Sequence, residues 1–421
     1  MSVLKSRINA LIAWGESYAK TDLRYLFRSG SWLTFGQIFI TSIAFVLSIA
    51  FARYLPKEVY GNYRYLLSVF WTLTAFSLTG ISTALTRAIA RGEDAAFGVA
   101  LRLSIFGSLP MTVISLGLAL YYFLHANILL AEGTFLIALI GPFMQGAYLY
   151  GSFLEGKKLF KQNALAGIGL NFFPAIALLG TLLVSRSAMV LFSVYLVANV
   201  LTGFVISILM YRRYRENANK PAPGFGWLGA HLSFMNVLST VANQIDRLLV
   251  YHFLGAVDLA VYAFATAMPD QLKSIFNSVS TFAFPKFVTR PIGETRTTLP
   301  RKLVGLTLVA GLCIVIYILL APYAFQLFFP GYTAAIGYSD LYALALIFIG
   351  GTIPPTILQA HMAKRALYIF NTGDSLFQIG SLVLLIPLYG LLGAVIARVI
   401  ARAFSFMLGM FLLRPYAVKT E

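Results

Sequence analysis

Residues 303–321 read LVGLTLVAGLCIVIYILLA, a run of nineteen residues without a single charge. A helix needs about 20 predominantly apolar residues to cross the hydrocarbon core of a bilayer, so this run is long enough to span a membrane. Apolar residues make up 59% of the 421-residue chain, and charged residues only 11%. Ordinary soluble domains carry about 25% charged residues, so this composition excludes both a cytosolic enzyme and a disordered chain.

Eleven further runs of similar length bring the predicted number of membrane-spanning helices to twelve. They occupy most of the chain and leave no loop long enough to hold a soluble domain. The sequence therefore predicts an all-α integral membrane protein. The twelve runs are 31–53, 64–86, 98–123, 128–153, 163–184, 188–211, 228–253, 260–284, 302–321, 338–360, 366–386 and 391–413.

The basic residues indicate how the chain is oriented. A net charge of +17 on its own would suggest a nucleic-acid partner. The Lys and Arg residues instead fall at the ends of the apolar runs, and 24 of the 32 lie on the side that holds both termini, against 4 on the opposite side. Cytoplasmic loops carry the excess of Lys and Arg, so we expect both termini in the cytoplasm and no nucleic-acid partner.

The twelve runs divide into two halves of six. Residues 54–63, YLPKEVYGNY, match residues 253–262, FLGAVDLAVY, and each segment follows the first run of its half. An even number of spans gives both halves the same orientation. We therefore expect a V-shaped molecule with a central cavity, its halves related by a pseudo-two-fold axis along the membrane normal. The predicted parts are a cytoplasmic amphipathic segment 1–28, an N-terminal half 29–215, a cytoplasmic linker 216–227, a C-terminal half 228–414 and a cytoplasmic tail 415–421.

Seven ionisable side chains within the predicted spans are the candidates for the site, because each costs about 2.5–3.5 kcal/mol there on insertion scales and therefore marks function. The cations outnumber the acids by four to three, so the set as a whole lacks an anion. A diphosphate supplies one, which guanidinium groups bind through paired hydrogen bonds and lysine binds as a point charge. The cations are Arg247, Lys273, Arg398 and Arg402, and the acids are Asp246, Asp270 and Asp374.

Structural ion pairs are an alternative role for part of this set. Residues at similar depth on neighbouring spans could neutralise one another and hold the helices together. Substrate binding is favoured most for the two cations that such pairs leave over, Lys273 and Arg398. The candidate pairs are Arg247 with Asp270 and Arg402 with Asp374.

Further polar side chains extend the candidate binding site. Arg53 and Arg64 lie at the outer ends of the first two spans, where they could meet the diphosphate as it leaves, although Arg64 equally suits an interfacial position. Gln37, Asn236 and Asn243 lie on the first span of each half, among polar residues spaced by three and four. Such a polar helix face suits a wet cavity that hydrogen-bonds sugars, and helix packing is the alternative.

The sequence points to no metal or cofactor. Cys313 is the single cysteine and lies inside an apolar run, and the four histidines are scattered. The sequence contains no Walker A phosphate-binding loop, so ATP is not expected to drive the protein directly. A proton or sodium gradient is the alternative, with Asp246, Asp270 and Asp374 as candidates for ion coupling.

Two motifs resemble a known family. Arg53-Tyr-Leu-Pro-Lys-Glu-Val-Tyr-Gly-Asn-Tyr63 and Asn243-Gln-Ile-Asp-Arg-Leu-Leu249, the latter followed by Phe253-Leu-Gly255, resemble the polysaccharide transporter family. Its members are O-antigen-type flippases of the multidrug/oligosaccharidyl-lipid/polysaccharide exporter superfamily, whose layout of twelve spans in two halves is also similar. The resemblance therefore extends over nearly the whole chain.

The resemblance implies a function. It implies export of polyprenyl (undecaprenyl)-diphosphate-linked oligosaccharide repeat units from the inner to the outer leaflet of the bacterial inner membrane. These units would serve the assembly of O-antigen, as in lipopolysaccharide, or of another surface polysaccharide. Membrane lipid and polysaccharide-assembly proteins, namely a polymerase and a chain-length regulator, are the other implied partners.

The residues themselves leave other functions open. A lipid II flippase would need the same surplus of cations for its diphosphate and would differ in its contacts with the glycan. A drug exporter would need an acidic or apolar cavity, whereas the surplus charge here is basic. A membrane glycosyltransferase or polymerase would carry catalytic residues on a sizeable outer loop, and the predicted outer loops are short. A scaffold without transport leaves the cations within the spans unexplained, so a non-enzymatic flippase working by alternating access is the favoured interpretation.

Overall fold

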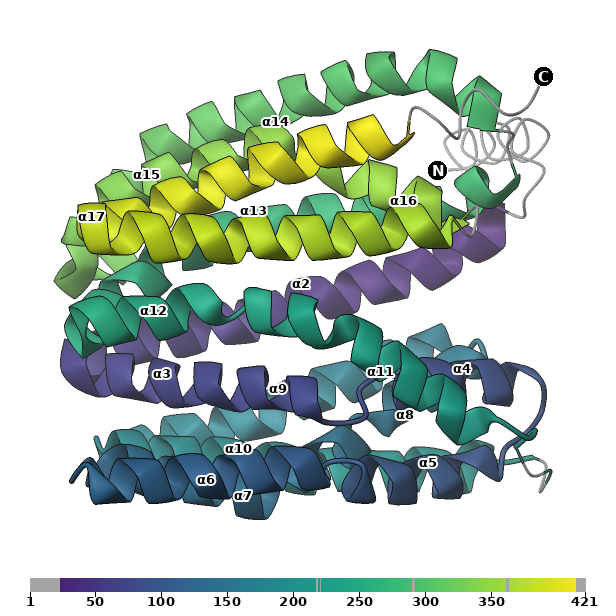
Figure 1. The fold of residues 1–421 in the computed structure, drawn as a ribbon, viewed down its shortest axis with the longest axis horizontal. Helices are drawn as coiled ribbons and strands as arrows, with labels where there is room; N and C mark the ends of the chain where they lie inside the picture. Colours follow the sequence, from purple (N-terminus) through teal and green to yellow (C-terminus); the bar gives the residue numbers. More distant parts are fainter. Residues whose placement is uncertain (1–22, 217–218, 220, 290–291, 361–362, 414–421) are drawn as a thin grey trace, which may run out of the picture.

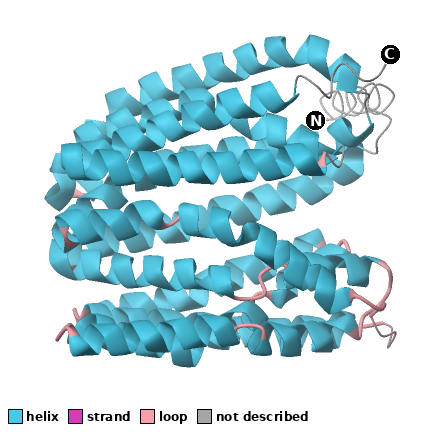
Figure 2. Ribbon diagram, in the orientation of Figure 1, coloured by secondary structure: helices cyan, strands magenta, loops and turns pink. Residues whose placement is uncertain are grey.

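The computed structural model describes residues 23–216, 219, 221–289, 292–360 and 363–413. Within these residues all regular structure is helical and no strand is present (Figure 2). The twelve predicted runs are all largely helical, although several are divided between two or more helices, and the all-α fold class is confirmed. Residues 1–22 and 414–421 lie outside the described part, so the predicted amphipathic segment and cytoplasmic tail stay predictions.

The N-terminal half contains several broken spans. The helices α3 and α4 together form one apolar span that is bent by 60°. A new helix, α6, begins beside Pro110, because proline lacks an N–H and suits only the first turn of a helix. The elements are α2 (Leu23–Tyr54), α3 (Lys57–Leu73), η1 (Thr74–Phe76), α4 (Ile81–Ala90), α5 (Ala96–Phe106), α6 (Leu109–Leu124), α7 (Ile128–Ala147), α8 (Leu149–Gly156), α9 (Phe160–Val184) and α10 (Ala188–Tyr214).

The C-terminal half ends in a helical hairpin. Gly390 has a φ of 58°, a conformation that side chains with a Cβ avoid, and α17 turns back on itself there. Figure 1 shows the two limbs of α17 running back along each other. The elements are α11 (Phe225–Ala242), α12 (Ile245–Leu254), α13 (Ala256–Thr289), α14 (Ile292–Phe328), η2 (Pro330–Ala335), α15 (Ile336–Ala343), η3 (Leu344–Thr352), α16 (Ile353–Ala360) and α17 (Lys364–Leu413).

The helices are long and apolar enough for a membrane. Among the described residues, 8 helices could cross a bilayer, or 9 when the bent pair is counted as one span. One of them, Arg365–Leu413, has 49 residues and contains both of the last two predicted runs. Large apolar side chains also point outward, such as Leu308, Leu312 and Leu319 of α14, which are 62–70% exposed and suit contact with lipid. The total of twelve spans and the symmetry of the halves stay predictions.

The two halves meet where the repeated segments lie. In Figure 1 the helices α3 to α10 form the lower layer and α13 to α17 the upper one, while α2, α11 and α12 run between them. At Gly61 of α3 a Cβ atom would collide with the backbone of Ala256, so the two helices touch directly. Beside this contact, the ring of Tyr60 lies 4.9 Å from that of Phe264, which in turn lies 4.1 Å from that of Tyr332. We call these three aromatic residues, with Gly61 and Ala256, the aromatic seam.

Two cations add contacts across the same interface. The Nη2 atom of Arg53 donates a hydrogen bond of 2.8 Å to the carbonyl oxygen of Leu327. The Nζ atom of Lys57 lies 5.4 Å from the ring centroid of Tyr332, within the range of a cation–π interaction. Because Arg53 and Lys57 belong to the predicted outer segments, the halves are joined on the side that is predicted to face outward.

An ionic clamp holds the linker to the N-terminal half at the opposite side. Asp94, which is fully buried, accepts hydrogen bonds from the Lys157 ammonium at 2.9 Å and from the backbone N–H of Glu216 at 2.8 Å. The Glu216 carboxylate lies 3.1 Å from the same ammonium. Burial lowers the pKa of Lys157, but its two acidic partners outweigh this effect and hold the pKa above its usual value. Further along the linker, Ala222 donates its N–H to the carboxylate of Glu93.

The clamp yields a stability prediction with an internal control. Asp94→Ala leaves the nearly buried ammonium of Lys157 without its buried partner, so we expect a loss of about 3–5 kcal/mol. Glu216→Ala removes a partner that is 73% exposed, and we expect a loss below about 1 kcal/mol. Thermal unfolding of the purified variants in detergent measures the difference. Equal losses in both variants would show that Asp94 is not the centre of the clamp.

Candidate functional site

The four cations of the predicted spans converge on one cavity. Its volume is about 290 Å³, and its lining is mostly polar. These four side chains are the Lys and Arg residues that lie in neither the cytoplasmic nor the outer loops, so membrane orientation does not account for them. The lining residues are Asn243, Gln244, Arg247, Asp270, Lys273, Tyr342, Arg398 and Arg402.

A helix break positions one wall of the cavity. The helices α11 and α12 are interrupted at Asn243 and Gln244, which leaves carbonyl groups at the end of α11 without helical partners. The side chain of Gln378 donates to the carbonyl oxygen of Ala242, and Arg398 donates to that of Asn243 at 3.5 Å. Side chains of α17 therefore cap this break and fix where α12 begins.

The first turn of α12 places a buried carboxylate against α17. The Nη2 and Nε atoms of Arg398 lie 2.8 and 2.9 Å from Oδ2 of Asp246, and the two side chains are only 10% and 2% exposed. The Tyr262 hydroxyl donates to the same oxygen at 2.8 Å, and the backbone N–H of Arg247 donates to Oδ1 at 2.9 Å. Both oxygens of Asp246 are therefore satisfied, which a buried carboxylate requires.

The neighbouring residue faces the cavity instead. Successive residues on a helix point about 100° apart, so Arg247 is directed away from the Asp246 pocket. Its Nη1 atom donates to the side chain of Gln244 at 2.8 Å. Its Nε atom is buried without a hydrogen-bond partner among the described residues. A buried guanidinium donor without a partner can bind an anionic group that enters the cavity.

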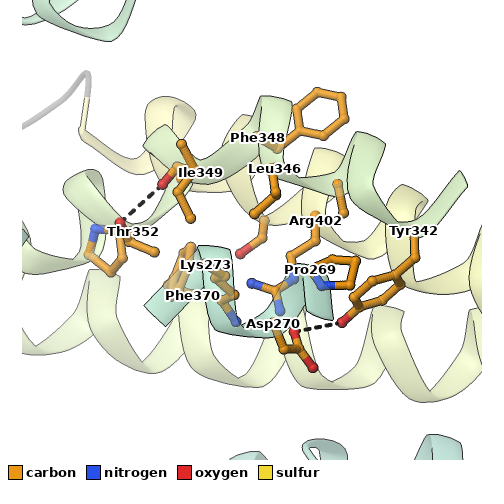
Figure 3. Close-up of a pocket in the computed structure, with 14 residues that line it drawn as sticks. Pro269, Asp270, Lys273, Tyr342, Leu346, Phe348, Ile349, Thr352, Phe370 and Arg402 are labelled. Carbon is orange, nitrogen blue, oxygen red and sulfur yellow. Dashed lines mark hydrogen bonds between the residues drawn. The ribbon is translucent and has the colours of Figure 1, made fainter. Parts of the chain in front are cut away.

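Lys273 lies among charges of both signs. It interacts electrostatically with Arg402, Asp270, Arg398 and Asp374. Figure 3 shows the side chains of Asp270, Lys273 and Arg402 directed toward one another from α13 and α17. Asp270 accepts a hydrogen bond of 3.0 Å from the Tyr342 hydroxyl, so part of its charge is already engaged. The cavity lining thus carries four cations and one carboxylate.

The ion pairing differs from the candidate pairs inferred from the sequence. Arg398 is paired with Asp246, whereas no ion pair joins Arg247 to Asp270 among the described residues. Asp374 accepts a hydrogen bond from Ser405, and it interacts with Arg402 only through longer-range electrostatics. The difference arises because the sequence gives the depth of a residue along its helix but not the direction in which its side chain points around the helix axis. Asp246 points toward α17, and it therefore pairs with Arg398.

The remaining candidates lie outside this cavity lining. Gln37 is exposed on α2, where it donates to Thr41 at 3.5 Å, and Asn236 is exposed on α11. Arg53 spans the interface of the two halves, as described above. Arg64 is half-buried on α3, and its Nε atom has no hydrogen-bond partner among the described residues.

Sequence reasoning missed two tyrosines of the site. Tyr342 binds Asp270, and Tyr262 binds Asp246. The chain contains 23 tyrosines, so residue type alone could not single them out. The repeat offered a signal for Tyr262, because this residue aligns with Tyr63 at the end of the matched segments. No comparable pattern marks Tyr342.

The buried pair predicts a non-additive effect on stability. Asp246→Asn leaves the guanidinium of Arg398 buried and unpaired, so we expect a loss of about 3–5 kcal/mol. Adding Arg398→Gln should restore much of that stability, because no unpaired charge then remains. A double-mutant cycle on thermal unfolding measures the coupling, with the exposed Glu132→Gln as the control. Simple additivity of the two losses would contradict the pairing.

Solved transporters share the overall fold. The structure superposes with a TM-score of 0.69 on an inward-facing multidrug resistance MATE family transporter of the MOP superfamily, at 15% identity, covering 91% of this chain and 96% of that one. An outward-facing MATE family transporter gives 0.62 at 15% identity, with coverages of 93% and 97%. The lipid II flippase MurJ in an inward closed conformation gives 0.64 at 14% identity, with coverages of 92% and 90%.

Sequence comparisons narrow the assignment further. The chain is 22% identical over 404 residues to a Shigella flexneri protein named "Putative O-antigen transporter", covering 88% of this chain and 94% of that protein. Residues 26–290 match the family described as "Polysaccharide biosynthesis protein". This match covers more than half of the chain. The chain is therefore a member of the polysaccharide biosynthesis protein family, with the fold of a MOP superfamily transporter.

Proposed function

We propose that the protein is a flippase that moves polyprenyl-diphosphate-linked oligosaccharide repeat units from the cytoplasmic to the outer leaflet. The observation that carries this proposal is the cavity lined by four cations and one carboxylate. Such a cavity favours an anion with several oxygen acceptors, and a diphosphate is one. The name of the Shigella flexneri relative supports the glycan class.

The geometry suggests which of the four cations bind the diphosphate. Arg398 is engaged by Asp246, so the groups with free hydrogen-bonding capacity are Arg247, Lys273 and Arg402. Arginine binds phosphate through two parallel hydrogen bonds, and lysine acts as a compact point charge. In this proposal the three cations hold the diphosphate, Asn243 and Gln244 contact the sugars, and the polyprenyl chain remains in lipid.

The aromatic seam suggests which state of the transport cycle this structure represents. If the Arg53 side faces outward, as the charge distribution predicts, the seam closes the outer side and the structure is inward-facing. The higher TM-score with the inward-facing MATE family transporter supports this assignment. Release to the outer leaflet then requires that the contacts of Tyr60, Phe264 and Tyr332 separate.

The Asp246–Arg398 pair offers a route for ion coupling. A diphosphate held by the other three cations brings negative charge beside this pair, which disfavours the ionised form of Asp246 and favours uptake of a proton or a sodium ion. Asp270 and Asp374 are the other candidates because they lie in the same charge cluster. On this proposal, an imposed pH or sodium gradient accelerates transport, and Asp246→Asn removes that acceleration.

Transport in the inner membrane fits the site better than the alternatives do. A basic cavity does not suit the cationic drugs of many exporters. Catalysis has no support in the names of the relatives, which are transporters and flippases. A lipid II flippase is the second candidate, because lipid II also presents a diphosphate and the fold matches MurJ. Delivery of repeat units to the outer leaflet would bring a polymerase and a chain-length regulator as partners.

The proposal predicts which variants lose transport. Lys273→Ala and Arg402→Ala each remove a charge-assisted contact worth about 1.5–3 kcal/mol, so we expect transport to fall by about tenfold or more. The assay uses proteoliposomes, a fluorescent polyprenyl-diphosphate oligosaccharide and a reagent that reaches only the outer leaflet. Arg186→Ala, an exposed cation in the loop between α9 and α10, is the matched control and should transport normally.

Two outcomes would contradict different parts of the proposal. Normal transport by folded, inserted Lys273→Ala and Arg402→Ala would show that the cavity is not the diphosphate site. Failure of the unaltered protein to move a range of lipid-linked glycans, lipid II included, would contradict the flippase function itself.

A further inference from the structure

A largely apolar pocket of about 150 Å³, shown in Figure 3, adjoins the cationic cavity inside the C-terminal half. The two share four lining residues, so a group bound at the cations lies at the mouth of the pocket. Beyond the mouth, the walls come from α13, η3, α16 and the two limbs of α17. The shared residues are Asp270, Lys273, Tyr342 and Arg402.

The shape of the pocket follows from an irregular helix. η3 is a 3₁₀ stretch of 9 residues, longer than such stretches usually run, and Phe348 inside it has non-helical dihedral angles. At Gly351 an added Cβ would lie within 3.2–3.3 Å of the backbone and side chain of Phe406, so η3 is pressed tightly against α17 there. Backbone that departs from regular geometry in this way is common at functional sites.

The pocket is polar at its mouth and apolar at its end. Leu346, Ile349 and Phe370 are buried apolar residues that line it, and Figure 3 shows Leu346 and Ile349 on the side away from Asp270. At the mouth, Asp270 accepts one hydrogen bond on Oδ1, and Oδ2 has no hydrogen-bond partner among the described residues. Lys273 supplies donors beside it. The mouth therefore offers an acceptor and a donor next to an apolar end.

We propose that this pocket receives the N-acyl group of an acylated amino sugar, namely the sugar that is bonded directly to the diphosphate. An acetamido group has an N–H that can donate to Asp270, a carbonyl that can accept from Lys273, and a methyl group for the apolar end. A hydroxyl at the same position would leave the apolar end unfilled. This inference rests on the proposed function, since it takes the diphosphate to be bound at the shared cations.

The size of the pocket fits a short substituent. An engineered apolar cavity of about 150 Å³ holds one benzene molecule, so this pocket has room for a small acyl group and not for a sugar ring with its hydroxyls. The sugar nearest the diphosphate is also the only sugar whose substituents must lie close to the bound cations. Later sugars of the repeat unit would extend past Asn243 and Gln244 on the polar side.

The test compares two lipid-linked monosaccharides in proteoliposomes. One is polyprenyl-diphosphate N-acetylglucosamine, and the other is polyprenyl-diphosphate glucose, which differs only in carrying a hydroxyl in place of the acetamido group. We expect kcat/KM to be about tenfold higher for the acetamido lipid, because filling a hydrophobic pocket with one small group gives discrimination of this order.

Two variants that fill the pocket test whether the preference for the acetamido lipid arises there. Leu346→Phe and Ile349→Phe both place a larger side chain at the apolar end, and each should reduce the ratio of the two kcat/KM values to about one. The control is Leu376→Phe on α17, where the leucine is 57% exposed on the outer surface, and it should keep the tenfold ratio. Using two filling variants keeps the test valid if one of them fails to fold.

The outcomes separate the inference from the function on which it rests. Equal kcat/KM values for the two lipids in the unaltered protein would overturn the acyl pocket and leave the flippase in place. A uniform loss for both lipids in the filling variants would also overturn it, and would point to another occupant such as the first isoprene unit. Transport of neither lipid, nor of any lipid-linked oligosaccharide, would contradict the proposed function as well.

Discussion

The buried pair of Asp246 and Arg398 is the interaction on which the arrangement of the C-terminal half depends. It joins the first turn of α12 to the second limb of α17, and it places both next to the break that ends α11. An unpaired charge at either position would be costly, so the two helices must approach closely and in one register. Arg247 then turns toward the cavity, which Lys273 and Arg402 also line. The pairing of the Asp246 carboxylate with Arg398 thus helps to determine which side chains line the cavity.

The contacts on the two sides of the molecule differ in kind. The aromatic seam joins the halves through ring contacts, a direct helix contact at Gly61 and a few polar contacts from Arg53 and Lys57. Such contacts can separate without leaving a buried charge unpaired, which suits an interface that opens in the proposed transport cycle. The clamp around Asp94 is ionic and buried, and it lies within one half, where no separation is required. The chemistry of each contact therefore matches whether movement is expected there.

Much of this architecture could be predicted from the sequence, because the bilayer imposes a length and an apolar composition on each helix. The four cations of the site could also be found, since the count of Lys and Arg by loop left those four over. Their partners could not be assigned, because pairing depends on rotation around each helix axis and on breaks such as the one at Asn243. The hydrogen bonds of Tyr262 and Tyr342 to the acids could not be predicted for the same reason. The pocket behind Asp270 depends on the irregular backbone of η3, which no periodic pattern encodes.

The clamped linker has a mechanical consequence. Hydrogen bonds to Asp94 and Glu93 fasten residues Glu216 and Ala222 of the linker to the N-terminal half. The next helix, α11, packs against α4, and the Ser233 hydroxyl of α11 accepts a hydrogen bond from the backbone N–H of Gly80. The 18 residues of α11 form a rigid rod of about 27 Å, one end of which is anchored to the N-terminal half. Its other end is the break at Asn243, inside the cationic cavity. A molecule bound in the cavity therefore contacts one end of this rod, while the other end is held by the N-terminal half.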